Sequence, residues 1–294
     1  MLRIRLKKIQ WECARAFLPS VLRRLSILSF LLLGVLQAHA QGGPPFITDD
    51  PGTPGNRHWE VNLGWMGQHT TSGGSYSIPN IDMNYGLGDR LQLKWELPLA
   101  AATDEQNTTV AGVGNSLLGV KWRPYEHYRS GEAKSDENQN FSWGFYPQVV
   151  VSNPTRSVRR GVVDPGPQYY LPTEVTWKLG PIAFNGEVGR WIGNRHVPDQ
   201  WAKGLIAGHE FSSRFEMYGE IYDLQDIDHA SGEAPGRAVT LDAGLRRSLD
   251  REGRMRLLLM GGRSIHHASP SEPDWIAYVG VQFQLGPRDE DKTK

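Results

Sequence analysis

Residues 89–99 read DRLQLKWELPL, a stretch in which apolar and polar side chains alternate from one residue to the next. The apolar side chains occupy the odd positions, which are Leu91, Leu93, Trp95, Leu97 and Leu99. Gln92, Lys94 and Glu96 occupy even positions between them. Because successive side chains of a strand point to opposite faces of a sheet, the stretch predicts a strand with one apolar and one charged face.

The same period-two alternation recurs from Trp59 to Leu285, in segments that are separated by turn-forming residues. The breaks lie at residues 73–74, 88–89, 180–181, 212–213, 250–253 and 269–273. They predict about 12 strands of roughly 9 to 13 residues, the length that a tilted membrane-spanning strand needs. These strands are predicted to begin near residues 57, 76, 89, 112, 141, 166, 181, 200, 213, 237, 253 and 274.

Residues 1–40 predict a cleaved signal peptide. Seven basic side chains and one acidic side chain precede the apolar run Leu25–Leu36, which is followed by Ala38-His39-Ala40. A basic region, a short apolar region and a small-x-small site are the three parts of a secretory signal. The run is shorter than the roughly 20 residues of a membrane anchor. We therefore expect export, with cleavage after Ala40.

The remaining chain has a composition that narrows the class of protein. The only cysteine, Cys13, lies in the leader, so no disulfide is expected. Removing the leader leaves 25 basic and 31 acidic residues, a formal charge of −6, which does not favour nucleic-acid binding. Beyond residue 40 no apolar run exceeds about four residues, against the 18 or more of a membrane helix. A helical membrane protein is therefore excluded.

Two classes of β protein fit this pattern. In an outer-membrane barrel the apolar faces contact lipid and tryptophans lie at the membrane boundary. In a soluble sandwich or lipocalin-like barrel the same rings are buried in a core. We expect the membrane barrel, because the strands are long and even in number. The tryptophans in or beside predicted strands are Trp59, Trp65, Trp95, Trp122, Trp177, Trp191, Trp201 and Trp275.

The connections support this class in part. Residues 180–181, 212–213 and 250–253 are predicted tight turns, whereas 102–111, 125–139 and 225–235 are longer and polar. Outer-membrane barrels have short turns on the periplasmic side and long loops outside. The two kinds alternate only imperfectly along this chain.

Several motifs resemble the outer-membrane barrel family that is named for the meta-pathway of phenol degradation. The opening is PFITDDPGTPG at residues 45–55, followed by HWE at 58–60. Similar pieces are YGLGD at 85–89, LKWELP at 93–98, GVGN at 112–115, GVKWR at 119–123, YPQ at 146–148 and FNGEVG at 184–189. The resemblance covers almost the whole mature chain. It implies a membrane barrel that is labelled a transporter, without an established substrate or catalytic residues.

The predicted organisation has four parts: a signal peptide at 1–40, a periplasmic N-terminal segment at 41–56, an up-and-down transmembrane barrel at 57–286 and a charged tail at 287–294. The tail departs from ordinary outer-membrane barrels, which end on an aromatic residue that the assembly machinery reads. Here Phe283 and Leu285 are followed by the charged tail, so either assembly departs from the standard route or the assembly signal is internal.

The polar faces of the strands predict a set of charged side chains in the barrel lumen. They are Lys94, Glu96, Lys121, Glu174, Lys178, Glu187, Glu216, Glu220, Asp242 and Arg246. One interpretation is that these charges line a water-filled path for small solutes. The other is that they fill a narrow interior, since the strand number lies between small filled barrels and wide porins.

The motif Thr48-Asp49-Asp50-Pro51 has two interpretations. Its carboxylates are ligands that suit a calcium ion. Asp and Pro also set turns, and we favour turn chemistry before the first strand. The motif is then either a periplasmic turn or a plug that folds into the barrel.

No catalytic or metal site is expected elsewhere. The nine histidines show no metal-ligand spacing. Ser264 and His266 share a strand face, as a hydrolase pair would, but no nucleophile elbow surrounds them. Residues 112–114 read GVG but precede no predicted helix, so a dinucleotide site is excluded.

The leading hypothesis is a non-enzymatic barrel in the bacterial outer membrane that lets small, aromatic or hydrophobic solutes diffuse across. Its expected partners are outer-membrane lipid, lipopolysaccharide and the barrel-assembly machinery, and no cofactor is expected. The rivals are a non-conducting structural or binding barrel and, behind it, a membrane hydrolase.

Overall fold

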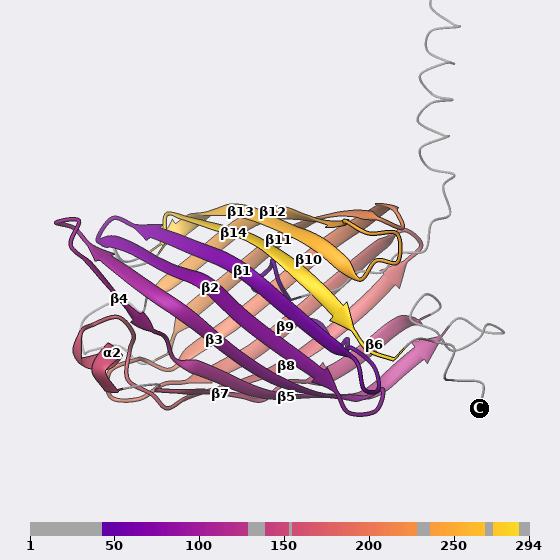
Figure 1. Ribbon diagram of the computed structural model, residues 1–294, viewed down its shortest axis with the longest axis horizontal. Coiled ribbons are helices and arrows are strands. Elements are labelled where there is room, and N and C mark those ends of the chain that lie inside the picture. The colour runs from indigo at the N-terminus through magenta and orange to yellow at the C-terminus, as the bar shows by residue number, and fades with distance from the viewer. Residues whose placement is uncertain (1–42, 129–138, 153–154, 228–235, 268–272, 288–294) are drawn as a thin grey trace, which may run out of the picture. The chain divides into compact units, whose positions relative to one another are not determined.

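The described residues form one closed antiparallel β-barrel (Figure 1). A computed structural model describes residues 43–128, 139–152, 155–227, 236–267 and 273–287. The strands are β1 (Trp59–Thr70), β2 (Gly73–Gly86), β3 (Leu91–Asp104), β4 (Thr109–Val113), β5 (Ser116–Tyr128), β6 (Gln139–Phe145), β7 (Gln148–Val151), β8 (Gln168–Leu179), β9 (Ile182–Ile192), β10 (Gln200–Ser212), β11 (Phe215–Asp226), β12 (Arg237–Ser248), β13 (Met255–His267) and β14 (Trp275–Leu285).

These fourteen segments make up twelve strands that run the full height of the barrel wall, and each of these twelve is here called a stave. β4 and β5 both pair with β3 and are separated only by Gly114 and Asn115, so they form one interrupted stave. β6 and β7 both pair with β5 and β8 and are separated only by Tyr146 and Pro147. The predicted count of twelve strands is therefore confirmed. Neither interruption was predicted from the sequence.

The wall closes between the first and last strands. β1 and β14 run antiparallel in continuous register, from Trp59 opposite Leu285 to His69 opposite Trp275. A closed ring leaves no strand edge unpaired, which two stacked sheets would not achieve. The sandwich alternative is therefore excluded.

One predicted break was misplaced. Gly73 and Gly74 were assigned to a turn, but they open β2, and residues 71–72 make the turn. Gly73 has a φ of +144°, and a Cβ atom there would lie 1.9 Å from the Thr103 carbonyl oxygen. Only glycine fits this close approach of two strands.

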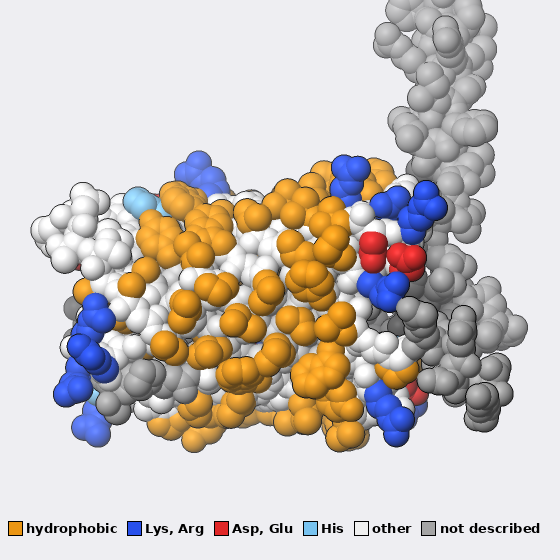
Figure 2. Space-filling model, in the orientation of Figure 1, with side chains coloured by type: hydrophobic (Ala, Val, Ile, Leu, Met, Phe, Trp, Pro, Cys, Tyr) orange, Lys and Arg blue, Asp and Glu red, His pale blue; other side chains and the backbone are white. Residues whose placement is uncertain are grey.

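The apolar faces of the strands point outward. On β8, Leu171 and Trp177 are 51% and 52% exposed, whereas Glu174 between them has no exposed surface. Figure 2 shows apolar side chains over the middle of the visible wall and charged side chains toward its two ends. This arrangement excludes the soluble barrel with its tryptophans in a core.

Most of the tryptophans follow this rule, and one does not. Trp59, Trp122 and Trp275 are 42%, 49% and 39% exposed on the outer wall. Trp191 instead points inward on β9 and stacks on Tyr170, with 4.4 Å between ring centroids. The expectation that Trp191 lies at a membrane boundary was wrong, because its position on β9 has the parity of the inward-facing Glu187.

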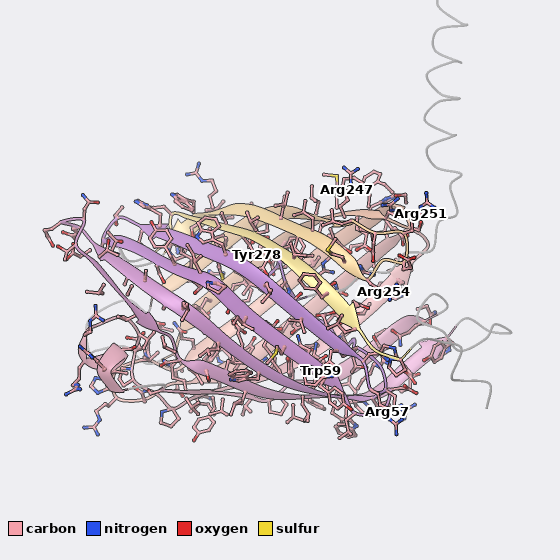
Figure 3. The ribbon with its side chains drawn as sticks, viewed as in Figure 1. Arg57, Trp59, Arg247, Arg251, Arg254 and Tyr278 are labelled. Carbon is pink, nitrogen blue, oxygen red and sulfur yellow. The ribbon has the colours of Figure 1, made fainter. Side chains whose placement is uncertain are left out.

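The two ends of the barrel differ. At the end where β1 begins, the connections 87–90, 180–181 and 213–214 are short, and Arg57, Arg247, Arg251 and Arg254 gather there (Figure 3). The opposite end carries the connection between β7 and β8, which includes helix α2 (Thr155–Arg159). β5 ends and β6 begins at the short-turn end, and residues 129–138 between them outnumber those of the other turns at that end, so the alternation is imperfect, as predicted. In the described part of the chain, no helix is long and apolar enough to span a membrane.

Several predictions fall outside the described residues. These are the signal peptide with Ala38 and Ala40, and nearly all of the charged tail at 287–294.

Candidate functional site in the barrel interior

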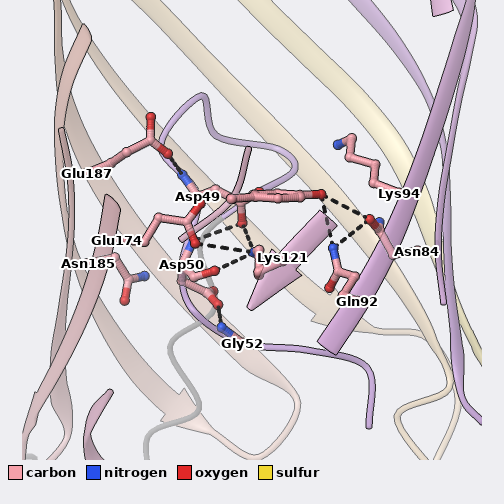
Figure 4. Close-up of polar contacts among 12 residues, drawn as sticks. Asp49, Asp50, Gly52, Asn84, Gln92, Lys94, Lys121, Glu174, Asn185 and Glu187 are labelled. Carbon is pink, nitrogen blue, oxygen red and sulfur yellow. Dashed lines mark hydrogen bonds and ion pairs between the residues drawn. The ribbon is translucent and has the colours of Figure 1, made fainter. Parts of the chain in front are cut away.

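Residues 43–56, here called the N-terminal segment, belong to no strand. Residues 43–52 lie inside the barrel, and the segment ends at the exposed Asn56 beside the turn between β2 and β3. Phe46, Thr48 and Asp50 are at most 5% exposed, and Pro51 is fully buried. Inward-facing side chains of β5, β9, β11 and β12 hold the segment, and Figure 4 shows part of this network. Of the two placements that the sequence left open, the structure therefore shows the inward-folded one.

Two carboxylates of the wall accept backbone N–H groups of the segment. Glu220 on β11 accepts from Thr48 at 2.6 Å and from Ile47 at 3.1 Å. Glu187 on β9 accepts from Asp49 at 3.0 Å and also from the Tyr170 hydroxyl. The three N–H contacts tie successive residues of the segment to two different strands, so they hold its backbone in place.

Lys121 on β5 is the main cation of the network. Its ammonium donates to the Asp49 carboxylate at 2.8 Å and to the Asp50 carbonyl oxygen, and it lies 3.6 Å from Glu174. It also lies 4.4 Å from the centre of the Tyr146 ring. Lys121 is 2% exposed, so these groups replace the water that a buried ammonium would otherwise need.

Arg246 on β12 binds the beginning of the segment. Its guanidinium donates to the carbonyl oxygens of Gly43 at 2.9 Å and Pro44 at 2.8 Å. The same group lies 5.3 Å from the centre of the Tyr218 ring. Arg246 thus holds the backbone where the segment enters the described structure.

An apolar pocket on the other side of the lumen receives Phe46. The Phe46 ring meets Tyr218 edge to face, with 5.4 Å between centroids. The rest of the pocket consists of Ile206, Leu258, Met260, Ile276 and Tyr278. The lumen therefore has an apolar sector and a charged sector, and the segment contacts both.

The turn that was predicted at Asp50 is also present. Its Oδ1 atom accepts the N–H of Gly52 at 2.5 Å, the pattern of an Asx turn. The turn and the plug are compatible, because this turn lies in the part of the segment that is buried inside the barrel. The carboxylate of Asp49 faces the Lys121 ammonium in place of a metal ion.

The ten predicted lumen side chains all point inward. Lys94 pairs with Asp82 at 3.1 Å and with Glu96 at 3.2 Å, and it lines the same cavity as Asp49 and Asp50 of the segment. Lys178, Glu216 and Asp242 are each at most 8% exposed. Lys121, Glu174, Glu187, Glu220 and Arg246 surround the segment. A role of any of them in solute passage stays a prediction.

Sequence reasoning missed the uncharged members of the network. Gln92 donates to Asn84 at 2.8 Å and to the Tyr146 hydroxyl at 3.1 Å. Gln92 and Asn84 were on the correct faces but carried no charge to mark them. Tyr146 lies in the interruption between β6 and β7, where the alternation gives no direction.

Little space remains beside the segment. The cavity between it, β2, β3 and β5 has a volume of about 30 Å³. A water molecule needs roughly 10 to 15 Å³ by this measure, so the cavity holds about two.

The alternative sites show no catalytic or metal geometry. Ser264 is buried, and its hydroxyl has no hydrogen-bond partner among the described residues, so no bond to His266 activates it. Within the described ranges, no three His, Cys, Asp or Glu side chains are grouped as metal ligands.

The ionisation of Asp49 is set by burial, by two lysines and by hydrogen bonds. Burial is the largest single effect and would raise the pKa of Asp49, but the positive charges of Lys121 and Lys94, together with the hydrogen bonds from Lys121 and from the Asp50 backbone, outweigh it and hold the pKa below the usual 3.8. A carboxyl with a lowered pKa stabilises the folded state above its unfolded value, and this contribution is lost as the pH falls through the folded value.

We expect the Asp49→Asn variant to be less stable than the parent chain by an amount that is constant from about pH 7 to pH 5. This difference should vanish only below the usual value of 3.8, because the parent then loses its own carboxylate charge. Urea unfolding of both proteins in lipid vesicles across this range measures it. A difference that disappears between pH 7 and pH 5 would contradict the lowered pKa.

Comparisons with known proteins support the fold. An outer-membrane channel from Pseudomonas putida F1 superposes with a TM-score of 0.61 at 12% sequence identity, over 83% of this chain and 100% of that one. The KdgM porin gives 0.49 at 8% identity, over 76% and 98% of the two chains. The NanC porin gives 0.48 at 8% identity, over 77% and 100%. The first likeness shows a shared barrel fold.

No family model matches the chain, and no curated protein is similar to it in sequence. The resemblance to the family named for phenol degradation therefore stays a prediction. Of that prediction, the comparisons support only the β-barrel fold.

Proposed function

We propose that the protein is an outer-membrane channel for small solutes whose lumen is closed here by the N-terminal segment. The observation that carries the proposal is the polar, charged lumen that a separate, non-strand segment occupies. A structural barrel that conducts nothing could fill its interior with the side chains of its strands alone. Here the filling is a piece of chain held by hydrogen bonds and ion pairs of side chains.

The outer wall supports the membrane location. A closed barrel satisfies every backbone hydrogen bond within the wall, which is what a bilayer demands. The apolar band of side chains would contact outer-membrane lipid, and the arginines at the short-turn end would remain in water (Figure 3). The predicted signal peptide and assembly by the barrel machinery belong to the same proposal.

Movement of the segment would leave the wall intact. Its main anchors are side chains of the strands, and the strands pair with one another without it. Withdrawal would expose Lys121, Arg246 and the neighbouring carboxylates to a water path. Charges of both signs would then select solutes by size and electrostatics.

The test is a disulfide that locks the segment in place. Pro51 contacts Gly144 on β6, where a Cβ atom would lie 3.2 Å from the Pro51 Cβ, close to the disulfide range of about 3.5 to 4.5 Å. The predicted mature chain contains no other cysteine. We expect the Pro51→Cys/Gly144→Cys variant to conduct less than the parent in planar bilayers when oxidised, and to recover on reduction. Each single variant serves as a control.

The second candidate is a non-conducting binding barrel, which the small remaining cavity favours. The locking experiment separates the two candidates. If the parent, the reduced variant and both single variants all lack conductance, the channel proposal fails and the binding barrel remains.

The membrane location predicts a depth-dependent effect of charge on the outer wall. Leu205 lies in the middle of β10 and is 50% exposed. Leu205→Arg should cost about 2–4 kcal/mol of folding free energy in vesicles, because arginine at the bilayer midplane is poorly solvated. Leu249→Arg, in the connection after β12, should cost about 0–1 kcal/mol. Equal costs at the two positions would argue against a bilayer around the wall.

A further inference from the structure

The lumen contains a buried carboxylate, Asp242, whose neighbour across the strand is a second carboxylate and not a basic side chain. Asp242 on β12 is 7% exposed, and neither of its carboxylate oxygens has a hydrogen-bond partner among the described residues. It lies directly opposite Glu220 on β11. Like charges placed opposite each other destabilise a sheet, and a buried carboxylate without a donor is costly. Within the described ranges, no basic side chain forms an ion pair with either member of this pair.

The Phe46 pocket lies beside this pair. Asp242 and Gly244 are successive inward positions of β12, so they are about 6.6 Å apart along the strand. A Cβ atom on Gly244 would lie 2.9 Å from the tip of the Phe46 ring, so the absence of a side chain makes room for the ring. An aromatic subsite and an anionic subsite therefore adjoin on one strand.

The N-terminal segment fills both subsites with its own groups. Phe46 supplies the ring, and the N–H groups of Ile47 and Thr48 supply donors to Glu220. None of these N–H groups donates a hydrogen bond to Asp242. A small molecule with a ring and a cationic donor group would match the same two subsites and also serve Asp242.

We infer that this part of the lumen is a binding site for arylalkylamines, in which an ammonium group lies between Glu220 and Asp242 and the ring replaces Phe46. An ammonium has three N–H donors, enough for both carboxylates. Its charge removes the repulsion between them. The inference rests on the proposed function, because the ligand reaches the site when the segment withdraws, and it names the solute class.

The test uses three fluorinated probes with the same ring and different charge. They are 4-fluorophenethylamine, 2-(4-fluorophenyl)ethanol and 3-(4-fluorophenyl)propionate, followed by fluorine NMR with the refolded full-length mature chain in detergent. We expect saturable binding of the amine only. Phe46→Ala, which vacates the ring pocket, should tighten it about tenfold. Asp242→Asn should weaken it about tenfold or more, because a charged hydrogen bond is lost.

The controls separate charge at the site from charge elsewhere. Glu105→Gln, in the exposed turn between β3 and β4, should leave binding unchanged. Asp242→Asn removes a repulsion and should fold at least as well as the parent. Equal binding of the three probes, or binding insensitive to Asp242→Asn, would overturn the inference, as would no saturable binding to Phe46→Ala.

The binding measurement and the conductance measurement test the two proposals separately. A chain that conducts in planar bilayers but does not bind the amine keeps the channel and loses the ligand class. A chain that binds the amine but never conducts keeps the site and supports the binding barrel.

Discussion

Lys121→Met should destabilise the protein by about 3–5 kcal/mol and release the N-terminal segment from the lumen. The ammonium of Lys121 is buried and serves Asp49, the Asp50 carbonyl oxygen and Glu174. Methionine fills a similar volume but removes the ion-pair partner of Asp49 and Glu174. Since the wall strands cannot move away from one another, the segment is the part that can leave and take Asp49 into water.

Two measurements follow this change. Urea unfolding in lipid vesicles gives the loss of stability. A cysteine in place of the fully buried Pro51 reports the position of the segment, because a water-soluble maleimide reaches it only after withdrawal. We expect faster labelling and higher conductance in Lys121→Met than in the parent.

Lys203→Met is the matched control. Lys203 pairs with Asp223 at 3.4 Å, but its side chain is 46% exposed at the surface. Such a pair contributes about 0–1 kcal/mol, and its loss should change neither labelling nor conductance. Adding Asp49→Asn to Lys121→Met should restore part of the stability, because the two residues interact directly. No recovery in the double variant would show that the two do not act as a pair.

The barrel wall could be predicted because one face of each strand is apolar. Shifting a strand such as β8 by one residue would place Leu171 and Trp177 in the lumen and Glu174 outside. The pattern therefore fixes the direction of the side chains as well as the existence of the strands. All twelve staves begin within a few residues of their predicted positions, from Trp59 to Trp275.

The alternation fails where the backbone leaves regular geometry. Pro147 follows Tyr146 at a break in the fifth stave, and nothing in the pattern shows that Tyr146 then points to the lumen. Trp191 was placed outside because tryptophan favours membrane boundaries, although its parity on β9 pointed inward. Parity was the better guide, because the pleat decides direction before residue preference does.

The contents of the lumen could not be predicted in the same way. The N-terminal segment has no periodicity, and its contacts join residues far apart in the chain, such as Thr48 with Glu220 and Gly43 with Arg246. The sequence analysis singled out both partners, one as a motif that resembles a known family and the other as inward charges, but it did not predict their pairing. The inward charges alone are compatible with an open lumen and with a filled one, so they do not decide between the two.

A second substitution tests the same segment by size instead of charge. Gly204 faces the lumen on β10, and a Cβ atom there would lie 1.9 Å from Thr48 Oγ1 and 2.9 Å from Thr48 Cβ. Thr48 cannot rotate out of the way, because its Cβ is fixed to a backbone whose N–H binds Glu220. Gly204→Val should therefore expel the segment while leaving the charges of the lumen unchanged.

The expected result for Gly204→Val is a large rise in maleimide labelling at Pro51→Cys and in conductance, with a loss of about 1–3 kcal/mol of stability. Gly261→Val is the control, since a Cβ atom on Gly261 meets nothing within 4 Å. If Gly204→Val labels as slowly as Gly261→Val, the segment tolerates the added side chain and does not fill the lumen as described. If labelling rises without conductance, withdrawal of the segment is not sufficient to open a path, because the inward side chains of the wall then close the lumen by themselves.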